Sequence, residues 1–370
     1  MVTEFNGKQQ LLRPEALIDL AAARHNLNCA KSAAPSSKVI AVIKSNAYGH
    51  GMLRIAKALE AADTFGLARM EEAVSLRQAG IEKRLLVLEG FFGRDELEAA
   101  SHYQIELAVN SPEQLSLLER SQLRQRVGCW LKVDTGMHRL GFPPNAAPRA
   151  HMRLSSCASV RPPIRLMTHL ASADDLQDAA TDQQIQRFLP LIGQLGGEIS
   201  IANSAALLGW PQTHYDWVRP GIMLYGASPL LGGRGERHEL KPVMTLSSRL
   251  IAVNRCASGD AVGYGGSWRC PEAMPVGVVS IGYGDGYPRH APTGTPLLVN
   301  GRRVPMVGRV SMDMVTVDLR SQPEAKVGDP VILWGRGMPA EEIAEAAGTI
   351  AYELFCGVTQ RVRFSEEDLG

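Results

Sequence analysis

A lysine stands where an apolar run meets a small polar turn. Lys44 follows Lys38–Ile43, which reads Lys-Val-Ile-Ala-Val-Ile, and precedes Ser-Asn-Ala-Tyr-Gly-His-Gly at 45–51, where a helix-like stretch opens. An amine in apolar surroundings loses hydration of its ammonium form, so its pKa falls and it can form a Schiff base or act as a general base. The alternative is a solvated lysine just past a strand, since most lysines lie on the surface.

Strand-like runs between residues 38 and 226 alternate with helix-period segments such as Met70–Gln78 and Asp182–Leu195. This alternation predicts parallel strands with crossover helices, and eight runs predict an α/β fold with a closed (β/α)8 TIM-like barrel. An open doubly wound sheet is the competing fold, although the first turn lacks a Gly-x-Gly-x-x-Gly fingerprint. The eight runs are Val39–Ile43, Phe65–Ala68, Leu85–Leu88, Glu106–Val109, Trp130–Val133, Arg165–Thr168, Ile199–Ala202 and Ile222–Tyr225.

A Gly-rich, charged connection at about 229–240 ends this alternation and predicts a domain boundary, as expected for a chain of 370 residues. We predict the barrel over 12–236 and a mostly β C-terminal domain over 237–370, with 1–11 packing against the latter. Asn300-Gly301 predicts a tight hairpin. The β-rich runs are Val243–Val253, Val276–Ile281, Leu297–Val299, Val315–Leu319 and Val331–Trp334, and Ala340–Ala347 is helix-like.

The charge is nearly balanced, with 39 Lys and Arg against 38 Asp and Glu. This balance argues against nucleic acid or an anionic membrane as the main partner and favours a small-molecule substrate. The six cysteines are scattered without Cys-x-x-Cys spacing, which indicates reduced core thiols, and residues 1–14 lack an apolar signal region. We therefore expect a cytoplasmic protein that spans no membrane and binds no metal.

Two loops near the end of the barrel could bind an anion. Asn203-Ser204 follow the seventh run, and Arg219-Pro220-Gly221-Ile222 occur at the eighth. Loops after strands 7 and 8 commonly hold phosphate in such barrels, and these offer backbone N–H groups, a hydroxyl and a glycine. Helix capping by Ser204 is the alternative.

The segment 41–51 resembles the cofactor-anchoring motif of alanine racemases, which carry pyridoxal 5′-phosphate on its lysine. Further matches occur in the same order and together cover nearly the whole chain. They are Leu131–Gly141 (LKVDTGMHRLG), Arg219–Gly226 (RPGIMLYG), Gly263–Gly266 (GYGG), Gly282–Tyr287 (GYGDGY) and Gly308–Met314 (GRVSMDM).

This resemblance implies a two-base interconversion of L- and D-alanine. Lys44 would hold the cofactor as an aldimine and work on one face of the substrate carbon, while Tyr264 of the partner subunit would work on the other. His169 would support Tyr264, whose pKa near ~10 must be lowered for it to act as a base. Arg219 would face the pyridine nitrogen of the cofactor. Because arginine keeps its proton, that nitrogen would stay largely unprotonated and withdraw electrons weakly, so the substrate carbanion would be reprotonated before side reactions compete.

The remaining roles also come from the resemblance. Cofactor binding is implied for Tyr48, His169, Asn203, Ser204, Gly221, Ile222 and Tyr352, and substrate binding for Arg139, Met312 and Asp313. Lys132 matches a position that carries a carbamate in many relatives, and Asp174, Tyr283, Arg289 and Arg309 resemble the entry corridor. The β domain of one subunit would complete the barrel site of the other, so a homodimer is implied.

Three other functions stay open at this point. A pyridoxal-phosphate-dependent decarboxylase shares the two-domain plan. A non-enzymatic pyridoxal-phosphate binding protein would not need residues 241–370. A barrel metallohydrolase using His50, His169, Asp134 and Asp174 lacks His-x-His or His-Glu-x-x-His spacing.

Overall fold

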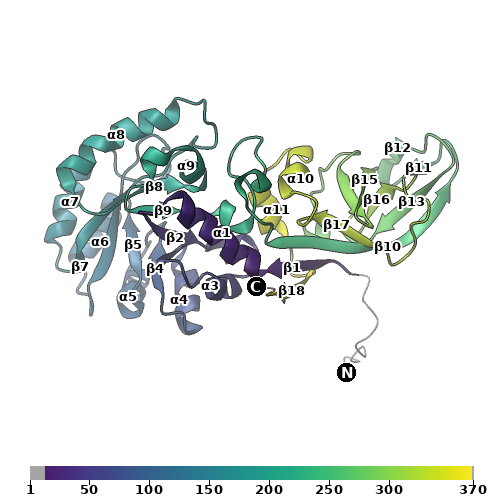
Figure 1. Ribbon diagram of the computed structural model, residues 1–370. Coiled ribbons are helices and arrows are strands. Elements are labelled where there is room, and N and C mark those ends of the chain that lie inside the picture. The colour runs from purple at the N-terminus through teal and green to yellow at the C-terminus, as the bar shows by residue number, and fades with distance from the viewer. Residues whose placement is uncertain (1–12, 369–370) are drawn as a thin grey trace, which may run out of the picture. The chain divides into compact units, whose positions relative to one another are not determined.

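The computed structural model describes residues 13–368 and divides into two units (Figure 1). One unit is Leu20–Lys241, and the other combines residues 13–19 with residues 242–368. This division differs from the predicted domains, 12–236 and 237–370, because the first strand, β1 (Glu15–Asp19), pairs with β10 (Met244–Cys256) and β18 (Arg363–Glu367). The predicted packing of 1–11 falls outside the described residues.

Eight parallel strands close a barrel in the first unit, in the order β2 to β9, which confirms the predicted fold class. The strands are β2 (Lys38–Val42), β3 (Thr64–Leu67), β4 (Arg84–Val87), β5 (Glu106–Val109), β6 (Val127–Lys132), β7 (Val160–Met167), β8 (Ile199–Asn203) and β9 (Trp217–Arg219). The helices are α1 (Leu20–Ala33), α2 (Lys44–Tyr48), α3 (Met52–Ala58), α4 (Met70–Gln78), α5 (Arg94–Tyr103), α6 (Pro112–Arg120), α7 (Ala147–Ser156), α8 (Ala180–Leu195) and α9 (Ser204–Gly209). Short 3-10 turns follow at η1 (Pro211–Thr213), η2 (Ile222–Tyr225) and η3 (Gly235–His238).

The eighth strand is not where the sequence predicted it. Ile222–Tyr225 forms the 3-10 turn η2, and the strand is the shorter β9, two residues upstream of it. Pro220 has no N–H to donate and Gly221 turns the backbone (φ −124°, ψ −92°), so the strand cannot continue through them. All four η2 residues are buried, so this segment is apolar because of its burial and not because it forms a strand.

The barrel interior is filled by large apolar side chains. Trp130 and Trp217 meet edge to face with ring centroids 5.7 Å apart, a favourable arrangement for aromatic rings. Both are fully buried in one cluster with Ile40, Leu86, Ala108 and Met167, which come from four other strands. The barrel is therefore a packed core rather than a pore.

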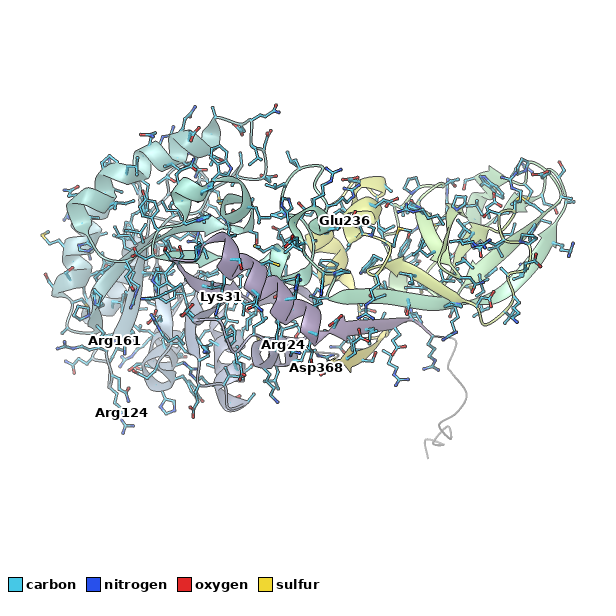
Figure 2. All side chains as sticks on the ribbon, in the orientation of Figure 1. Arg24, Lys31, Arg124, Arg161, Glu236 and Asp368 are labelled. Atoms are coloured by element: carbon cyan, nitrogen blue, oxygen red, sulfur yellow. The ribbon has the colours of Figure 1, made fainter. Side chains whose placement is uncertain are left out.

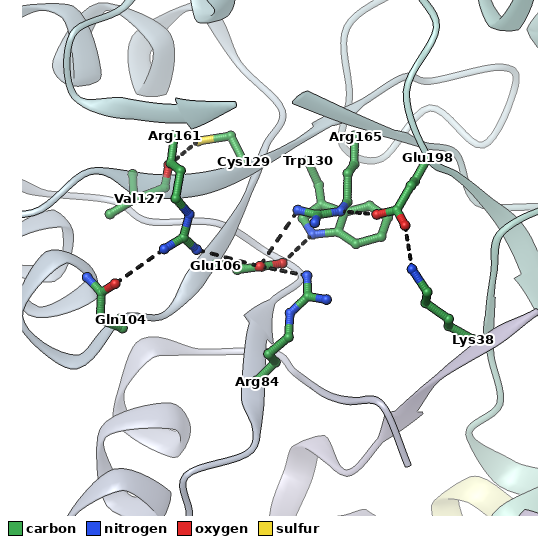
Figure 3. Close-up of polar contacts among 10 residues, drawn as sticks. All are labelled: Lys38, Arg84, Gln104, Glu106, Val127, Cys129, Trp130, Arg161, Arg165 and Glu198. Carbon is green, nitrogen blue, oxygen red and sulfur yellow. Dashed lines mark hydrogen bonds and ion pairs between the residues drawn. The ribbon is translucent and has the colours of Figure 1, made fainter. Parts of the chain in front are cut away.

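A charge network lies at the end where the strands begin (Figure 3). Buried Glu106 accepts hydrogen bonds from Arg84 at 2.7 Å and from the Trp130 indole at 2.9 Å. Glu198 accepts from Lys38 at 2.6 Å and Arg165 at 2.5 Å, and these bonds outweigh the effect of burial and lower its pKa to about 2. Arg161 also lies near Glu106. Figure 2 shows Arg161 and Arg124 at the edge of the barrel. In barrels of this kind, this end stabilises the fold.

The second unit is mostly β, as predicted. Its main sheet has the order β13-β16-β15-β14-β17-β10-β1-β18, and β10 also pairs with β13. Asn300 and Gly301 (φ 49° and 74°) form the predicted two-residue hairpin between β14 and β15, since both residues adopt the positive φ that such turns require. The other elements are β11 (Ala261–Val262), β12 (Trp268–Arg269), β13 (Met274–Val279), β14 (Pro296–Val299), β15 (Arg302–Val307), β16 (Val315–Asp318), β17 (Pro330–Trp334), η4 (Tyr264–Gly266), η5 (Tyr283–Asp285), α10 (Ala340–Ala346) and α11 (Ala351–Gly357).

Candidate active site

The carboxyl ends of the barrel strands carry most of the predicted site residues. Lys44 follows β2, Lys132 ends β6, His169 follows β7, Asn203 ends β8 and Arg219 ends β9. Because parallel strands of a closed barrel all end on one face, these side chains share that face. The barrel therefore brings together residues that lie up to 175 positions apart in sequence, as the ~250-residue size of such barrels requires.

The site is rich in positive charge. Burial and, after it, the nearby cations Arg219, Arg139 and Lys44 together lower the pKa of Lys132 to about 8, against a smaller raising effect of Glu89. Lys132 is largely buried at 9% exposure. An unmodified Lys132 therefore releases its proton much more readily than an ordinary lysine, and the site as a whole favours anions.

Arg219 is a buried cation whose partners are all neutral. Its Nη1 donates to Ser200 Oγ at 2.6 Å, and its Nη2 donates to the Thr168 and Ile201 carbonyls at 2.6 and 3.1 Å. Burial lowers its pKa to about 10. Within residues 13–368 its Nε has no hydrogen-bond partner, and Nη1 has one acceptor for its two N–H groups, so both nitrogens retain a donor for a ligand.

His169 is held in one tautomer. Its Nδ1 lies 3.2 Å from Nη2 of Arg219, and because a guanidinium can only donate, Nδ1 accepts and the ring proton resides on Nε2. Burial, and after it Arg219, Lys132, Arg139 and Lys44, hold the pKa of His169 well below its ordinary value. His169 is therefore neutral at pH 7 and offers an Nε2–H donor.

Polar contacts join the loops that follow the last two strands. The Gly221 amide donates to Ser204 Oγ at 2.7 Å, and Asn203 caps α9 by accepting from the Ala206 amide at 3.0 Å. A Cβ on Gly221 would lie 2.6 Å from the Tyr48 hydroxyl, so any other residue here would force Tyr48 to shift. Asn203, not Ser204, caps the N-terminus of α9, so the Ser204 hydroxyl is available to accept from the Gly221 amide. Ile222, the next residue after Gly221, is fully buried.

The chain leaves Lys44 in an unusual conformation. Ser45, Asn46, Ala47 and Tyr48 all have φ between 50° and 54°, which makes α2 a left-handed turn. For residues other than glycine this handedness costs on the order of 1–2 kcal/mol each, so surrounding contacts must hold the turn. The sequence had predicted only that a helix-like stretch opens here, without its handedness.

The buried side chain of His50 stabilises this turn. Its Nδ1–H donates to the carbonyls of Tyr48 at 2.9 Å and Ala47 at 3.1 Å, and its ring packs against Tyr225 at a tilt of 31°, with centroids 4.6 Å apart. Burial lowers the pKa of His50 to about 4. Tyr48 packs against the same Tyr225 ring, also tilted by 31°, with centroids 4.7 Å apart, so one aromatic cluster supports the end of the turn.

The second unit carries the other predicted residues. Tyr264 begins η4 between glycines with positive φ and is 71% exposed. The position that a Cβ on Gly265 would occupy lies 3.4 Å from the guanidinium of Arg309, so Arg309 lies beside the Tyr264 loop. Tyr352 lies on α11, while Arg289 is exposed beyond η5. Asp174 belongs to the barrel unit, where its carbonyl accepts from Leu231.

Met312 and Asp313 lie against the η5 segment. The Met312 carbonyl accepts from the Gly284 amide at 2.8 Å, next to Tyr283. Asp313 accepts a hydrogen bond from Arg361 at 2.6 Å, and Arg361 also lies 3.3 Å from Asp285. Arg361 was not predicted, because nothing in its sequence neighbourhood distinguishes it from a surface arginine.

Three further residues that contact the barrel site were missed. Ser200 and Thr168 hold Arg219, and Glu72 of α4 accepts from the Ser45 amide beside Lys44 at 2.6 Å. Ser200 did carry a signal, since it is a polar residue within the buried apolar strand β8. Glu72 lies in an ordinary charged helix turn, and no feature of the sequence distinguishes it from a surface glutamate.

The barrel site combines a nucleophilic amine with several hydrogen-bond donors. The amine of Lys44 lies at a strand end, Arg219 retains N–H donors, and the Ser204 hydroxyl lies beside the Gly221 amide. Such a set can hold an anion while an amine meets a carbonyl carbon. Within residues 13–368, no three His, Cys, Asp or Glu side chains group closely enough to bind a metal ion, and no helix is long and apolar enough to cross a membrane.

The chain matches two family models end to end. Residues 18–229 match "Alanine racemase, N-terminal domain" and residues 243–365 match "Alanine racemase, C-terminal domain". Among known sequences, it is 53% identical over 349 residues to an alanine racemase of Nitrosococcus oceani, covering 94% of this chain and 98% of that one. It is 50% identical over 359 residues to one of Coxiella burnetii, covering 96% and 99%.

Solved structures give the same result. The biosynthetic alanine racemase of Pseudomonas aeruginosa superposes with a TM-score of 0.93 at 45% identity, covering 96% of this chain and 99% of that chain. An alanine racemase of Bartonella henselae, described with covalently bound pyridoxal phosphate, superposes with a TM-score of 0.87 at 28% identity, covering 96% and 99%. With both family models matched over nearly the whole chain, the protein belongs to the alanine racemase family.

Proposed function

We propose that this chain interconverts L-alanine and D-alanine with pyridoxal 5′-phosphate, acting in the cytoplasm as a homodimer. The observation that best supports this is the charge around Lys132, on which three cations, Arg219, Arg139 and Lys44, act against one carboxylate, Glu89. Such an excess suits a ligand with several negative charges, as a phosphate-bearing cofactor and an amino-acid carboxylate together provide.

The barrel residues fit this cofactor. Lys44 would bind its aldehyde, and the unused Nε–H of Arg219 would face its ring nitrogen. When bound, the cofactor supplies a ring that withdraws electrons from the substrate carbon and makes its hydrogen acidic. The phosphate would be held by Tyr48, Asn203, Ser204, Gly221, Ile222 and Tyr352, and His169 would lie beside the ring.

Arg219 would set the limits of the chemistry. Its pKa of about 10 keeps it protonated at neutral pH, so it offers the ring nitrogen a hydrogen bond rather than a proton. Among residues 13–368, its hydrogen-bond partners are Ser200, Thr168, Ile201 and His169, and none of these contacts is to a carboxylate. Weaker electron withdrawal favours rapid return of a proton to the substrate carbon, which suits racemisation better than elimination or transamination.

Two residues would move the proton. The amine of Lys44 would serve one face of the substrate carbon, and the hydroxyl of Tyr264 of the partner subunit would serve the other. Removal on one face and delivery on the other inverts the carbon. In its own chain Tyr264 is 71% exposed, which supports its insertion into a second copy.

The substrate carboxylate would be bound by Arg139 and the Met312 backbone N–H, with Asp313 orienting them. Asp174, Tyr283, Arg289 and Arg309 would line a narrow entry that favours small amino acids. Lys132, with a pKa of about 8, can present a neutral amine to CO2. The N–C bond would form as one proton leaves, giving a carbamate that neutralises the excess positive charge beside Arg139.

The proposal is tested by incubating the purified protein and pyridoxal phosphate with single enantiomers of small and basic amino acids. We expect L-alanine to become a mixture with D-alanine, and D-alanine to do the reverse. Release of CO2 from a basic amino acid would instead indicate a decarboxylase. Cofactor bound to Lys44 without any change in alanine chirality would refute racemisation.

A further inference from the structure

We propose that Glu72 of α4 is a positioning residue that sets the orientation of Lys44 by holding the left-handed turn that follows it. The inference depends on the proposed cofactor-binding role of Lys44. Glu72 would touch neither cofactor nor substrate, but it would determine the direction in which the amine of Lys44 points.

The turn after Lys44 has an unfavourable backbone conformation. Lys44 is the last residue before four consecutive residues, Ser45–Tyr48, with φ of 50–54°. None of them is a glycine, so none adopts this conformation freely. A turn of this handedness persists only when its surroundings hold it, and its first peptide group determines the direction in which Lys44 leaves the strand.

Glu72 contacts the first residue of this turn. Oε1 of Glu72 accepts a hydrogen bond of 2.6 Å from the amide of Ser45, the first residue of the left-handed turn. A carboxylate accepting from a backbone amide makes a short, charge-assisted bond that is stronger than one between neutral groups. This bond joins the turn after β2 to the helix after β3.

Helix capping alone does not explain Glu72. Its Oε2 accepts from the Ala68 amide at 2.8 Å and the Arg69 amide at 3.2 Å, which is the capping contact at the start of α4. Its Oε1 is a separate atom with a separate partner, Ser45. The carboxylate therefore fixes two loops of the barrel mouth at once, with one oxygen for each.

The far end of the turn is held by other residues. Asn46 Oδ1 accepts from the Met52 amide at 2.9 Å, and His50 donates to the Ala47 and Tyr48 carbonyls. These contacts keep Tyr48 against Gly221, whereas Glu72 acts at the Lys44 end. Loss of Glu72 should therefore disturb the Lys44 amine more than the contact between Tyr48 and Gly221.

The test compares four variants with the native protein: Glu72→Ala, Glu72→Gln, the control Glu71→Gln, and the double variant Ser45→Gly with Glu72→Ala. Glu71 is the exposed neighbour in the same helix turn. Cofactor-free protein is incubated with graded pyridoxal phosphate, reduced with borohydride, and the labelled Lys44 peptide is quantified by mass spectrometry. Thermal unfolding and alanine racemisation are measured on the same samples.

We expect half-labelling of Lys44 to require about 10- to 100-fold more cofactor in Glu72→Ala, the range for losing a hydrogen bond to a charged group. Glu72→Gln should show a smaller effect, because one amide oxygen can accept from only one of the two loops. Glu71→Gln should stay within about 2-fold of native, as surface changes usually do. Glycine adopts positive φ freely, so Ser45→Gly should restore part of the labelling.

Native labelling in Glu72→Ala would overturn the inference, as would a double variant no better than Glu72→Ala alone. Unfolding of both Glu72 variants would also overturn it, because the carboxylate would then support the barrel rather than the turn. A native protein that labels at Lys44 yet forms no D-alanine would refute racemisation and leave the role of Glu72 intact.

Discussion

His50 should make the barrel unit sensitive to mild acid. The ring is fully buried, and its folded-state pKa is about 4, compared with about 6.5 in the unfolded chain. Between these values the unfolded chain binds a proton that the folded chain does not, so lowering the pH favours unfolding. Stability is therefore lost as pH falls through 6.5, and the loss levels off below about 4.

The size of this effect follows from the shift. The full difference of about 2.5 pKa units corresponds to about 3 kcal/mol, of which about 2 kcal/mol is lost between pH 7 and pH 5. For a unit of this size, each kcal/mol changes the melting temperature by roughly 2–4 °C, so the contribution of His50 is about 4–8 °C.

The perturbation is His50→Asn, whose amide can still donate to the Ala47 and Tyr48 carbonyls but does not titrate. Calorimetric scans of cofactor-free protein at pH 7 and pH 5 measure the drop in melting temperature for native protein, His50→Asn and His102→Asn, an exposed histidine on α5. Other titrating groups contribute equally to all three. We expect the drop to be about 4–8 °C smaller in His50→Asn alone.

An equal drop in native protein and His50→Asn would refute the reasoning. It would mean that the ring is protonated in the folded state at no cost, and therefore that it is not the neutral donor to the turn. A variant that is destabilised at pH 7 does not by itself affect the test, because the measured quantity is the change between the two pH values.

Four other outcomes are expected. In CO2-free buffer, native protein should gain stability as pH rises from about 8 to 10, because unfolded Lys132 still binds a proton there, and calorimetry of Lys132→Met should show no such gain. Ser200→Ala leaves a donor of Arg219 unpaired and should weaken cofactor binding about 10-fold in a fluorescence titration. Tyr264→Phe should keep the visible absorption band of the loaded protein, yet slow loss of the α-hydrogen of L-alanine in D2O at least ~100-fold by NMR. Glu106→Gln should lower the free energy of unfolding by about 3–5 kcal/mol in denaturant titrations while leaving kcat near native.

Much of the fold was predictable because burial leaves a periodic trace. Seven barrel strands and the helix Met70–Gln78 were found from apolar runs and helical spacing. The eighth strand was misplaced because Trp217–Arg219 is only three residues long, while Ile222–Tyr225 is apolar owing to burial in a 3-10 turn. The pairing of β1 with β10 and β18 joins distant segments, and such contacts leave no local pattern.

The site was predictable where residues stand at strand ends in motifs, and less so where a side chain acts through another. Lys44 and Arg219 are marked by their positions. Glu72 is one acid among several on a helix, and only the folded geometry shows that its carboxylate reaches the Ser45 amide. The handedness of the turn was also hidden, because its residues carry none of the glycines that usually signal positive φ.

The pairing of β1 with β10 and β18 has a consequence for the order in which the chain folds. About 220 residues of barrel separate β1 from its first partner, and at roughly 5–20 residues per second β1 waits on the order of 10–45 s during synthesis. The barrel can close in that interval, whereas the other sheet cannot be completed until β18, its last strand, has emerged. A circular permutation that opens the chain between β1 and α1 and joins β18 to β1 through a linker would make the split unit continuous and remove that delay.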